Sequence, residues 1–338
     1  MKILYIHIGT HKTGTTAFQN ILKKNSTKLL RKDGVALIDI EEFPRLKEFK
    51  QSDEVDKGLA DDLAGFLEQR AVRHKNILSY EGFSGKTTKV VYSNTGVLAK
   101  ILRDATQSFE TKILVFFRRQ DEFIQSLFTQ KVHQGQSIQI QDFINDLDFK
   151  FLDWNNFLNP WIQTFGEENI TVFPYDPIVL NEKKVHELLN DVIKSKTLSA
   201  IQDVPEKNIG MSKNATQIMK GMSEVLNPDE KKILRRVLQK VDNKGINQEY
   251  NILNSEIKSK IIAHFDNSNR LLSTKYYSEK FNMENFSRPF FVTDNDQPIE
   301  KSYQKLIKGL IFEVNTNREK SKGSYLFKML FEKLKSKL

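Results

Sequence analysis

Short runs of apolar and β-branched residues alternate with longer amphipathic segments through the first half of the chain. In five of these runs polar residues do not alternate with the apolar ones, which is typical of parallel strands that are buried on both faces. They are Lys2–Ile8, Val35–Ile38, Asn76–Tyr80, Lys112–Phe117 and Asn169–Phe173. Between them, apolar residues recur at spacings of three and four, which predicts helices at Thr15–Lys24, Asp56–Arg70, Thr95–Phe109 and Gln120–His133. Strands that alternate with helices predict an α/β fold with a mainly parallel sheet flanked by helices.

After about residue 180 the strand pattern stops and a mainly helical C-terminal part follows. The predicted helices are Glu182–Ile193, Ser212–Leu226, Asp229–Val241 and Ser255–Tyr277, interrupted by a polar surface loop at Ser195–Lys213. Residues 282–298 are irregular, and Ile299–Phe312 is one further helix candidate. We therefore expect an α/β domain over residues 1–282 and a helical extension with a basic amphipathic tail over residues 283–338.

Composition narrows the chemistry that this chain can perform. The 338 residues are 39% hydrophobic and 28% charged, which is ordinary for a soluble protein with a full core. The absence of cysteine excludes disulfides, thiolate catalysis and cysteine metal sites, and the six scattered histidines form no HExxH motif, so no metal site is expected. The net charge of +9 favours anionic partners such as nucleotides, nucleic acid, acidic glycans or membrane lipids.

A glycine-containing loop separates the first predicted strand from the first helix. Its sequence runs Gly9-Thr10-His11-Lys12-Thr13-Gly14-Thr15-Thr16. The free backbone N–H groups and the dipole of a helix N-terminus favour a bound anion at this place. The loop is not a Walker A motif, because Thr15 holds the place of its lysine and Lys12 precedes Gly14 by two residues. A turn rich in Thr and Gly that holds no ligand is the alternative.

The KTGTT-x-x-Q run from Lys12 to Gln19 resembles the 5'-phosphosulfate loop of the PAPS-dependent sulfotransferases. PAPS is 3'-phosphoadenosine 5'-phosphosulfate, and the closest likeness is to bacterial carbohydrate-type members. The resemblance implies a P-loop-like α/β fold, PAPS as sulfuryl donor, PAP as product and no metal requirement. It further implies that Lys12 is catalytic and that the donor is bound by Thr13, Gly14, Thr15 and Thr16.

A second motif of that family also has a counterpart in this chain. Arg118 follows the strand Lys112–Phe117, and Ser126 lies eight residues later in the next helix. In the family, such an Arg and Ser bind the 3'-phosphate of PAPS, and a guanidinium matches a phosphate with paired N–H donors. Arg119 is either a second contact or a solvated side chain. Cytosolic members often carry Trp where this chain has Ala17, so the residue that stacks on adenine is not identified.

Three further segments resemble the family less specifically. They are Phe173-Pro174-Tyr175-Asp176 after a strand, the segment Lys207–Ser212 at the place of a nucleotide-covering loop, and Asn269–Tyr276 at the place of the helix that closes the bacterial domain.

Glu81 is the expected catalytic base, since it follows the strand Asn76–Tyr80 at the carboxyl edge of the sheet, where α/β sites form. Bacterial relatives place an S-x-E at this strand end, and Ser79-Tyr80-Glu81 fits that pattern loosely. His11, inside the phosphate loop, is the second candidate: it either hydrogen-bonds the sulfuryl group or braces the turn. Glu81 could instead cap a loop or pair with a surface lysine.

The last 22 residues, 317–338, carry seven Lys or Arg against two Glu, with apolar residues on one helical face. Such a segment either lies on an anionic membrane surface or packs as a terminal helix on the domain or on a second copy. Met1–Gly9 is too short for a secretory h-region, and no apolar stretch approaches about 20 residues. We expect a cytoplasmic protein, peripheral on the inner membrane face if the tail binds lipid.

Three classes of function remain open from the sequence. The first is a sulfotransferase that moves a sulfuryl group from PAPS to a hydroxyl or amine of a carbohydrate, cell-surface glycan or other small acceptor. The second is a P-loop kinase, which the displaced lysine disfavours. The third is a nucleic-acid-binding protein, which only the charge suggests, so no nucleic-acid partner is expected. The acceptor site is expected among residues 82–94 and 134–160.

Overall fold

The structure is a computed structural model that describes residues 1–87, 90–201, 213–222, 226–242, 252–281, 283 and 286. The segment Lys207–Ser212, the helix expected at Ile299–Phe312 and the tail 317–338 lie outside these residues. Contacts within the chain divide it into two units, which are described separately. The first comprises Met1–Phe123, Asp146–Pro205 and Lys260–Arg288, and the second comprises Ile124–Asn145, Glu206–Ser259 and Pro289–Leu338.

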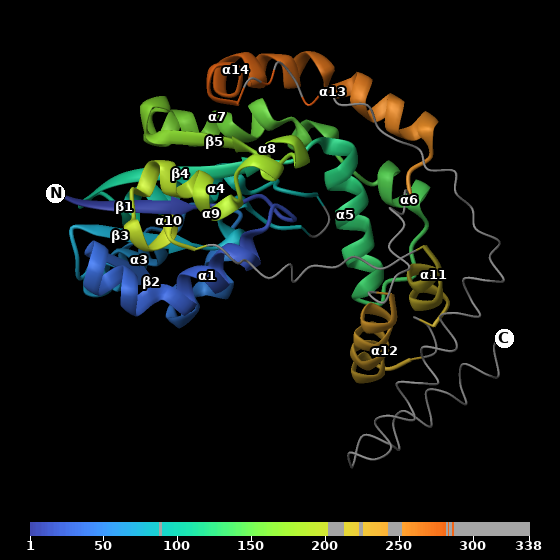
Figure 1. Ribbon diagram of the computed structural model, residues 1–338, viewed down its shortest axis with the longest axis horizontal. Coiled ribbons are helices and arrows are strands. Elements are labelled where there is room, and N and C mark those ends of the chain that lie inside the picture. The colour runs from blue at the N-terminus through green and yellow to red at the C-terminus, as the bar shows by residue number, and fades with distance from the viewer. Residues whose placement is uncertain are drawn as a thin grey trace, which may run out of the picture. The chain divides into compact units, whose positions relative to one another are not determined.

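A parallel five-stranded sheet forms the centre of the first unit (Figure 1). Its order is β2-β3-β1-β4-β5, with bounds β1 Lys2–His7, β2 Val35–Ile38, β3 Lys75–Ser79, β4 Phe109–Phe117 and β5 Ile170–Pro174. β1 is central and pairs with both β3 and β4, with His7 opposite Ser79 and Leu114. The strands are apolar and largely buried on both faces, as a covered parallel sheet requires.

Helices cover both faces of this sheet, as the sequence predicts. The helices of the first unit are α1 Thr15–Lys28, α2 Leu46–Gln51, α3 Lys57–Arg70, α4 Thr95–Ala105, α7 Trp154–Phe165, α8 Pro177–Glu182, α9 Val185–Ile193, α10 Lys196–Ser199 and α14 Ser278–Phe281. Right-handed crossovers place α1, which leads to β2, on one face, and α3, α4 and α7 on the other. The contacts agree, since α4 packs on α3 and α7, while α1 packs on α9.

The carboxyl end of β1 is the switch point of this topology. The connection that leaves β1 crosses one face of the sheet, whereas those that leave its neighbours β3 and β4 cross the other. The loops after β1, β3 and β4 therefore diverge at one edge of the sheet, and open α/β sheets bind ligands at such a switch point. The α/β fold with a P-loop-like parallel sheet is confirmed.

Several predicted bounds differ from those observed. The helix predicted at Thr95–Phe109 ends at Ala105, because Phe109 begins a strand that is three residues longer at its start than Lys112–Phe117. Glu182–Ile193 is not one helix: α8 ends at Glu182 and α9 begins at Val185. The region 134–160, expected as loops, contains α6 Ile140–Asn145 and the first part of α7, which Asp153 caps.

The second unit is helical in all its described elements. It holds α6, α11 Lys213–Gly221 and α12 Pro228–Asp242, while α5 Gln120–His133 and α13 Ser255–Tyr276 each contribute residues to both units. The predicted boundary at residue 282 stays a prediction, because most of the chain beyond it is outside the described residues. In the portion described, no helix is both long and apolar enough to cross a membrane.

Candidate functional site

The loop Gly9–Thr16 leaves β1 at the switch point and turns through three left-handed residues. Gly9 has φ 34°, Lys12 has φ 66° and Gly14 has φ 77°. The Thr10 hydroxyl donates to the Phe116 carbonyl at 2.7 Å, and the Thr13 hydroxyl donates to the Thr10 carbonyl at 2.6 Å. These bonds fasten the loop to β4 and to itself. A lysine with positive φ is uncommon, so the loop holds Lys12 at a conformational cost.

The first turn of α1 is open to an anion. Gly14 is its N-cap, no side chain caps the turn, and it contains no acidic residue. Thr15 is buried and its hydroxyl has no hydrogen-bond partner, whereas Thr16 is exposed. Orphan N–H groups and the helix dipole give this turn an affinity for negative charge that nothing in the described fold satisfies.

The side chains of His7 and Thr15 fill the space next to Gly9. A Cβ on Gly9 would lie 2.6 Å from Thr15 Oγ1 and 3.1 Å from His7 Nε2. His7 is fully buried, its Nδ1 lies 2.9 Å from the Ser79 hydroxyl, and its Nε2 has no partner. Burial lowers the pKa of His7 to about 3, so its ring is neutral. Position 9 therefore requires glycine for both its φ and its space.

The Lys12 backbone and the Glu81 carboxylate meet at the carboxyl edge of the sheet. The Lys12 backbone N–H donates to Glu81 Oε1 at 3.2 Å. The two residues are 69 positions apart in the chain, and the pairing of β1 with β3 brings them together. Burial raises the pKa of Glu81, against the lowering effects of that N–H and of the charges of Lys12 and Lys50. Burial also lowers the pKa of Lys12, which Glu81 opposes and Arg118 reinforces. The structure thus brings a carboxylate with enhanced basicity to the backbone of Lys12, whose side chain is half-buried.

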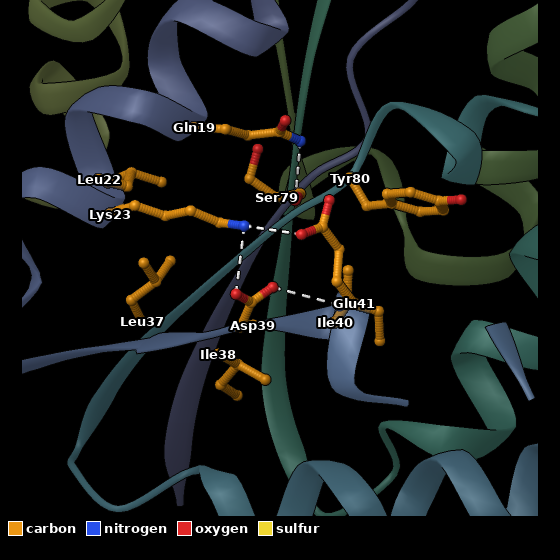
Figure 2. Close-up of a pocket in the computed structure, with 10 residues that line it drawn as sticks. All are labelled: Gln19, Leu22, Lys23, Leu37, Ile38, Asp39, Ile40, Glu41, Ser79 and Tyr80. Atoms are coloured by element: carbon orange, nitrogen blue, oxygen red, sulfur yellow. Dashed lines mark hydrogen bonds and ion pairs between the residues drawn. The ribbon is translucent and has the colours of Figure 1, made fainter. Parts of the chain in front are cut away.

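Gln19 ties α1 to the strand that carries Glu81. Its Nε2 donates to the Ser79 carbonyl at 3.0 Å (Figure 2). Gln19 belongs to the KTGTT-x-x-Q run, so the sequence contains the signal, but only the fold shows which group it contacts. The bond links the helix that follows the loop Gly9–Thr16 to the end of β3, two residues before Glu81.

Arg118 lies beside the loop at the end of β4. Its Nη1 is 3.5 Å from the Lys12 carbonyl, and its Nε donates to Glu122 at 3.1 Å. The guanidinium carbon is 5.7 Å from the centre of the Tyr175 ring, and a Cβ on Gly14 would lie 3.2 Å from that ring. Tyr175 thus lies beside both Arg118 and Gly14, the N-cap of α1. The side chain of Arg118 keeps 26% of its surface exposed, so it remains accessible.

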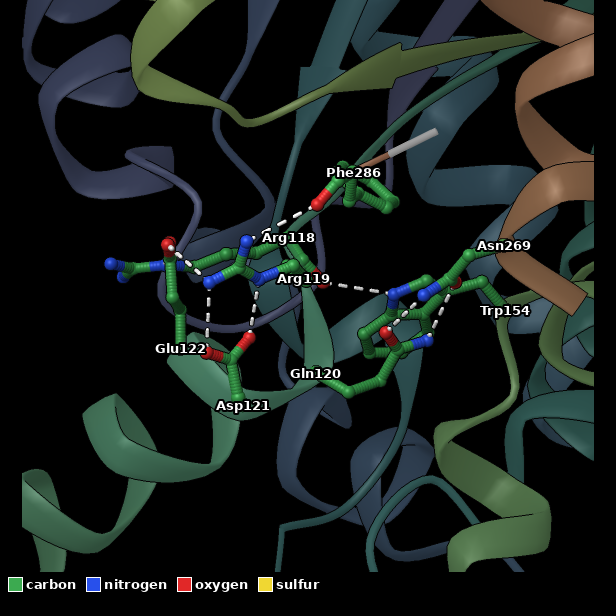
Figure 3. A network of polar contacts seen from close by, with 8 residues as sticks. All are labelled: Arg118, Arg119, Gln120, Asp121, Glu122, Trp154, Asn269 and Phe286. Carbon is green, nitrogen blue, oxygen red and sulfur yellow. Dashed lines mark hydrogen bonds and ion pairs between the residues drawn. The ribbon is translucent and has the colours of Figure 1, made fainter. Parts of the chain in front are cut away.

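Arg119 faces away from the loop into a closed polar network (Figure 3). It is 4% exposed and donates twice to Asp121, at 2.6 and 3.0 Å, and once to the Phe286 carbonyl at 3.1 Å. Beside it, Gln120 and Asn269 exchange two amide hydrogen bonds at 3.0 and 2.9 Å. Arg119 is therefore not a solvated side chain, and these partners fix it within the core.

His11 is enclosed by the loop rather than exposed in it. Its backbone N–H donates to the Tyr92 hydroxyl at 2.8 Å, and its Nδ1 lies 3.1 Å from the same oxygen. Burial lowers the pKa of His11 to about 3, and the charges of Lys50 and Lys12 add to this effect. This geometry favours the bracing interpretation. Tyr92 belongs to no sequence motif, so the sequence alone does not reveal its contact with His11.

Ser126 lies on the part of α5 that belongs to the second unit and is half-buried. Its assignment to a 3'-phosphate stays a prediction. No group of three His, Cys, Asp or Glu side chains that could hold a metal is found among the described residues.

Comparisons with known proteins add little to this geometry. No family model matches the chain, and no curated protein matches it. Among solved structures, it is similar to a crystal structure of a sulfotransferase from Alicyclobacillus acidocaldarius, with 10% identity, a TM-score of 0.42, and coverage of 80% of this chain and 94% of that one. A likeness at that level carries no argument about activity, so the function rests on the residues themselves.

Proposed function

We propose that this protein is a PAPS-dependent sulfotransferase that acts on a hydroxyl or amine of a carbohydrate acceptor. One observation carries the proposal: the uncapped N-terminus of α1, which has no acidic residue, follows Lys12, whose backbone N–H donates to the half-buried Glu81 carboxylate and whose carbonyl lies 3.5 Å from the Arg118 guanidinium. Two cations and an open helix turn suit a donor with separate anionic groups. A carboxylate with a raised pKa suits an acceptor that must lose a proton.

The residues present fit the donor. The open first turn of α1 supplies backbone N–H donors for a 5'-phosphosulfate, with Thr13, Gly14, Thr15 and Thr16 forming the loop. Arg118 is assigned to the 3'-phosphate, where a guanidinium offers paired N–H groups. Tyr175 contacts both elements and is a candidate for holding the nucleoside between them.

Glu81 and Lys12 divide the chemistry between them. Glu81 accepts the acceptor's proton as its oxygen or nitrogen bonds to sulfur and the bond from sulfur to the bridging oxygen breaks. Lys12 places positive charge on that bridging oxygen, where negative charge develops as PAP leaves. His11 and Tyr92 brace the loop that presents Lys12. No residue in this scheme needs a metal ion.

Thermal unfolding with nucleotides tests the proposal on the full chain. At one hundred times its dissociation constant, PAP should stabilise the protein by about 2.7 kcal/mol, which is roughly 4 °C in Tm for a chain of 338 residues. ADP and ATP should shift Tm less, and Mg²⁺ should not alter the PAP shift. A larger shift with ATP and Mg²⁺ than with PAP would favour the kinase class, and no shift with PAP would refute the proposal.

A further inference from the structure

A phenol hydroxyl from a distant part of the chain holds the loop Gly9–Thr16. The Tyr92 oxygen accepts the His11 backbone N–H at 2.8 Å, and His11 Nδ1 lies 3.1 Å from the same oxygen, although the two residues are 81 positions apart. Tyr92 is fully buried, and its ring packs edge-on against Phe157 at 5.3 Å. The hydroxyl therefore has a fixed place beside the residue that precedes Lys12.

Tyr92 has a backbone conformation that aromatic residues rarely adopt. Its φ is 62°, and in the described portion of the chain the other non-glycine residues with left-handed φ are Lys12 and Lys194. Lys194 is the C-cap of α9, where such a conformation is common. Tyr92 and Lys12 cap no helix, and His11 connects them through the hydrogen bond to Tyr92. Strained backbone of this kind persists only where the surrounding structure imposes it, and it gathers at functional sites.

Hydrogen bonds outside the loop impose the conformation of Tyr92. Its N–H donates to the Lys86 carbonyl at 2.8 Å, and the Lys86 N–H donates to Asn94 Oδ1 at 3.0 Å. Asn94 Nδ2 donates in turn to the carbonyls of Lys50 and Ser52, at 3.2 and 2.8 Å, where α2 ends. The turn that carries Tyr92 is thus fastened to α2 by groups that do not depend on His11.

The groups at this contact determine where its hydrogens lie. A backbone N–H can only donate, so the Tyr92 oxygen is the acceptor for the His11 N–H. The hydroxyl hydrogen of Tyr92 then needs an acceptor, and His11 Nδ1 lies 3.1 Å away. Ser84 is the other hydroxyl beside Tyr92, and it gives its own hydrogen to the Glu81 carbonyl at 2.8 Å. Because a neutral imidazole has one hydrogen, an Nδ1 that accepts leaves that hydrogen on Nε2.

We propose that Tyr92 is a positioning residue that holds His11 with its ring hydrogen on Nε2, so that His11 donates to the sulfuryl group and does not act as a base. The inference rests on the proposed function and deepens it. The backbone N–H and Nδ1 are both committed to Tyr92, so Nε2 is the ring atom left for a ligand of the loop. The nitrogen that could accept a proton is occupied, which leaves the role of base to Glu81.

The same contact fixes the turn that presents Lys12. Tyr92 holds the His11 N–H, and Glu81 holds the next N–H along the chain, that of Lys12, at 3.2 Å. Two successive peptide groups are therefore held by side chains from outside the loop. Without the Tyr92 hydroxyl, the His11 peptide loses its partner and the left-handed conformation of Lys12 loses one of its two supports.

The first test measures the ring hydrogen of His11 on the full chain without ligand. Nitrogen NMR of the histidine rings distinguishes protonated from unprotonated ring nitrogens, and the His11 signals are those that His11→Gln removes. We expect a protonated Nε2 and an unprotonated Nδ1, and in Tyr92→Phe a mixture of both tautomers. The matched control is Tyr277→Phe, since Tyr277 is also fully buried and its hydroxyl has no partner among the described residues. A hydrogen on Nδ1 in the wild type would mean that Tyr92 donates elsewhere and would overturn the inference.

The second test compares the binding of PAPS and PAP by calorimetry, because only PAPS has the sulfuryl group. His11→Asn removes the donor at the place of Nε2, whereas the longer amide of His11→Gln restores an N–H there. We expect His11→Asn and Tyr92→Phe to weaken PAPS by about tenfold, the worth of a hydrogen bond to a charged group, and to weaken PAP far less. His11→Gln should bind PAPS within about threefold of the wild type. If Tyr92→Phe does not fold, the two variants at position 11 carry the same comparison.

The two proposals fail in different ways. If the wild type binds neither PAP nor PAPS, the proposed function fails, and the NMR measurement, which needs no nucleotide, still decides the state of His11. If both nucleotides bind but His11→Asn and Tyr92→Phe weaken them equally, Tyr92 is a structural brace alone and the inference is overturned. Unchanged PAPS binding in these variants would overturn it as well, and the assignment of the donor would stand.

Discussion

The turns that follow β1 and β4 lie at the same edge of the sheet and lead into helices of equal length, yet they treat charge in opposite ways. The turn into α1 has no acidic residue, no side-chain cap and an unpartnered buried hydroxyl on Thr15. The turn into α5 has Asp121 and Glu122 in its first helical turn, and Arg119 pairs with both. One helix N-terminus is neutralised by acidic residues of its own first turn, whereas the other has no acidic residue or side-chain cap in its first turn.

The difference shows how to separate structural from functional charge among neighbouring residues. Arg118 and Arg119 are adjacent in sequence, but Arg119 uses its donors inside the fold, whereas Arg118 stays partly exposed beside the loop. A buried, satisfied group contributes to stability and a partly unsatisfied one at a crevice is available for binding. Substitutions of Arg119 should therefore change the free energy of unfolding, whereas substitutions of Lys12 or Arg118 should change transfer or PAP binding.

The largest expected effect is on stability, at the closed turn. Arg119→Met leaves the Asp121 carboxylate buried without its partner, which should lower the free energy of unfolding by about 3 to 5 kcal/mol. Urea denaturation measures the loss. Replacing both residues, Arg119→Met with Asp121→Leu, should recover much of it, because no lone charge then remains buried. A single variant as stable as wild type would remove the distinction between the two turns.

Next in size is a split between transfer and affinity at the open turn. Lys12→Met should reduce the rate of sulfuryl transfer by about 10³ with much of the PAP affinity retained, because its charge acts on the leaving oxygen. Arg118→Met should instead weaken PAP binding by about tenfold or more, the worth of a charge-assisted hydrogen bond. Unfolding free energies of both variants serve as controls and should stay close to wild type. Two fully active variants would place the site elsewhere.

The smallest of these effects is a change in the pH profile. Glu81 must be deprotonated to act as base, so kcat/KM should fall as pH drops through its pKa, which burial raises above the ordinary 4.5. Lys12 must be protonated, so activity should also fall as pH rises through its pKa, which burial lowers below 10.5. Glu81→Gln should lower kcat/KM by about 10² and remove the acidic limb. An acidic limb that survives in Glu81→Gln would assign it to another group.

The sheet was predictable because parallel strands buried on both faces leave a strong local signal. All five strands were found from runs such as Lys2–Ile8, and the alternation with helices gave the fold class. The ends were less predictable. Phe109 fits a helical spacing as well as a strand, and only its pairing with Lys2 on β1 assigns it to β4. The sequence does not predict the helix over Trp154–Phe165, because Pro160 within it is typical of a helix end.

The candidate site likewise combines residues that the sequence identifies with contacts that only the fold shows. Lys12, Gly14 and Arg118 could be named from motif and strand end, and the fold brings Lys12, Glu81 and Arg118 to one edge. Contacts made at long range could not be read from the sequence. Nothing local shows that Arg119 reaches Phe286 or that Tyr92 holds His11. Those depend on crossovers that connect segments far apart in the chain.

The crowding around Gly9 also restricts how the anion-binding loop can change over time. Any side chain at position 9 would collide with Thr15 and His7, and His7 in turn is matched to Ser79. A single substitution at one of these places leaves a clash or a hole, so we expect positions 7, 9, 15 and 79 to vary together or not at all. Redesign of the loop for a different donor would have to begin with this set in the core and not with the exposed Thr16.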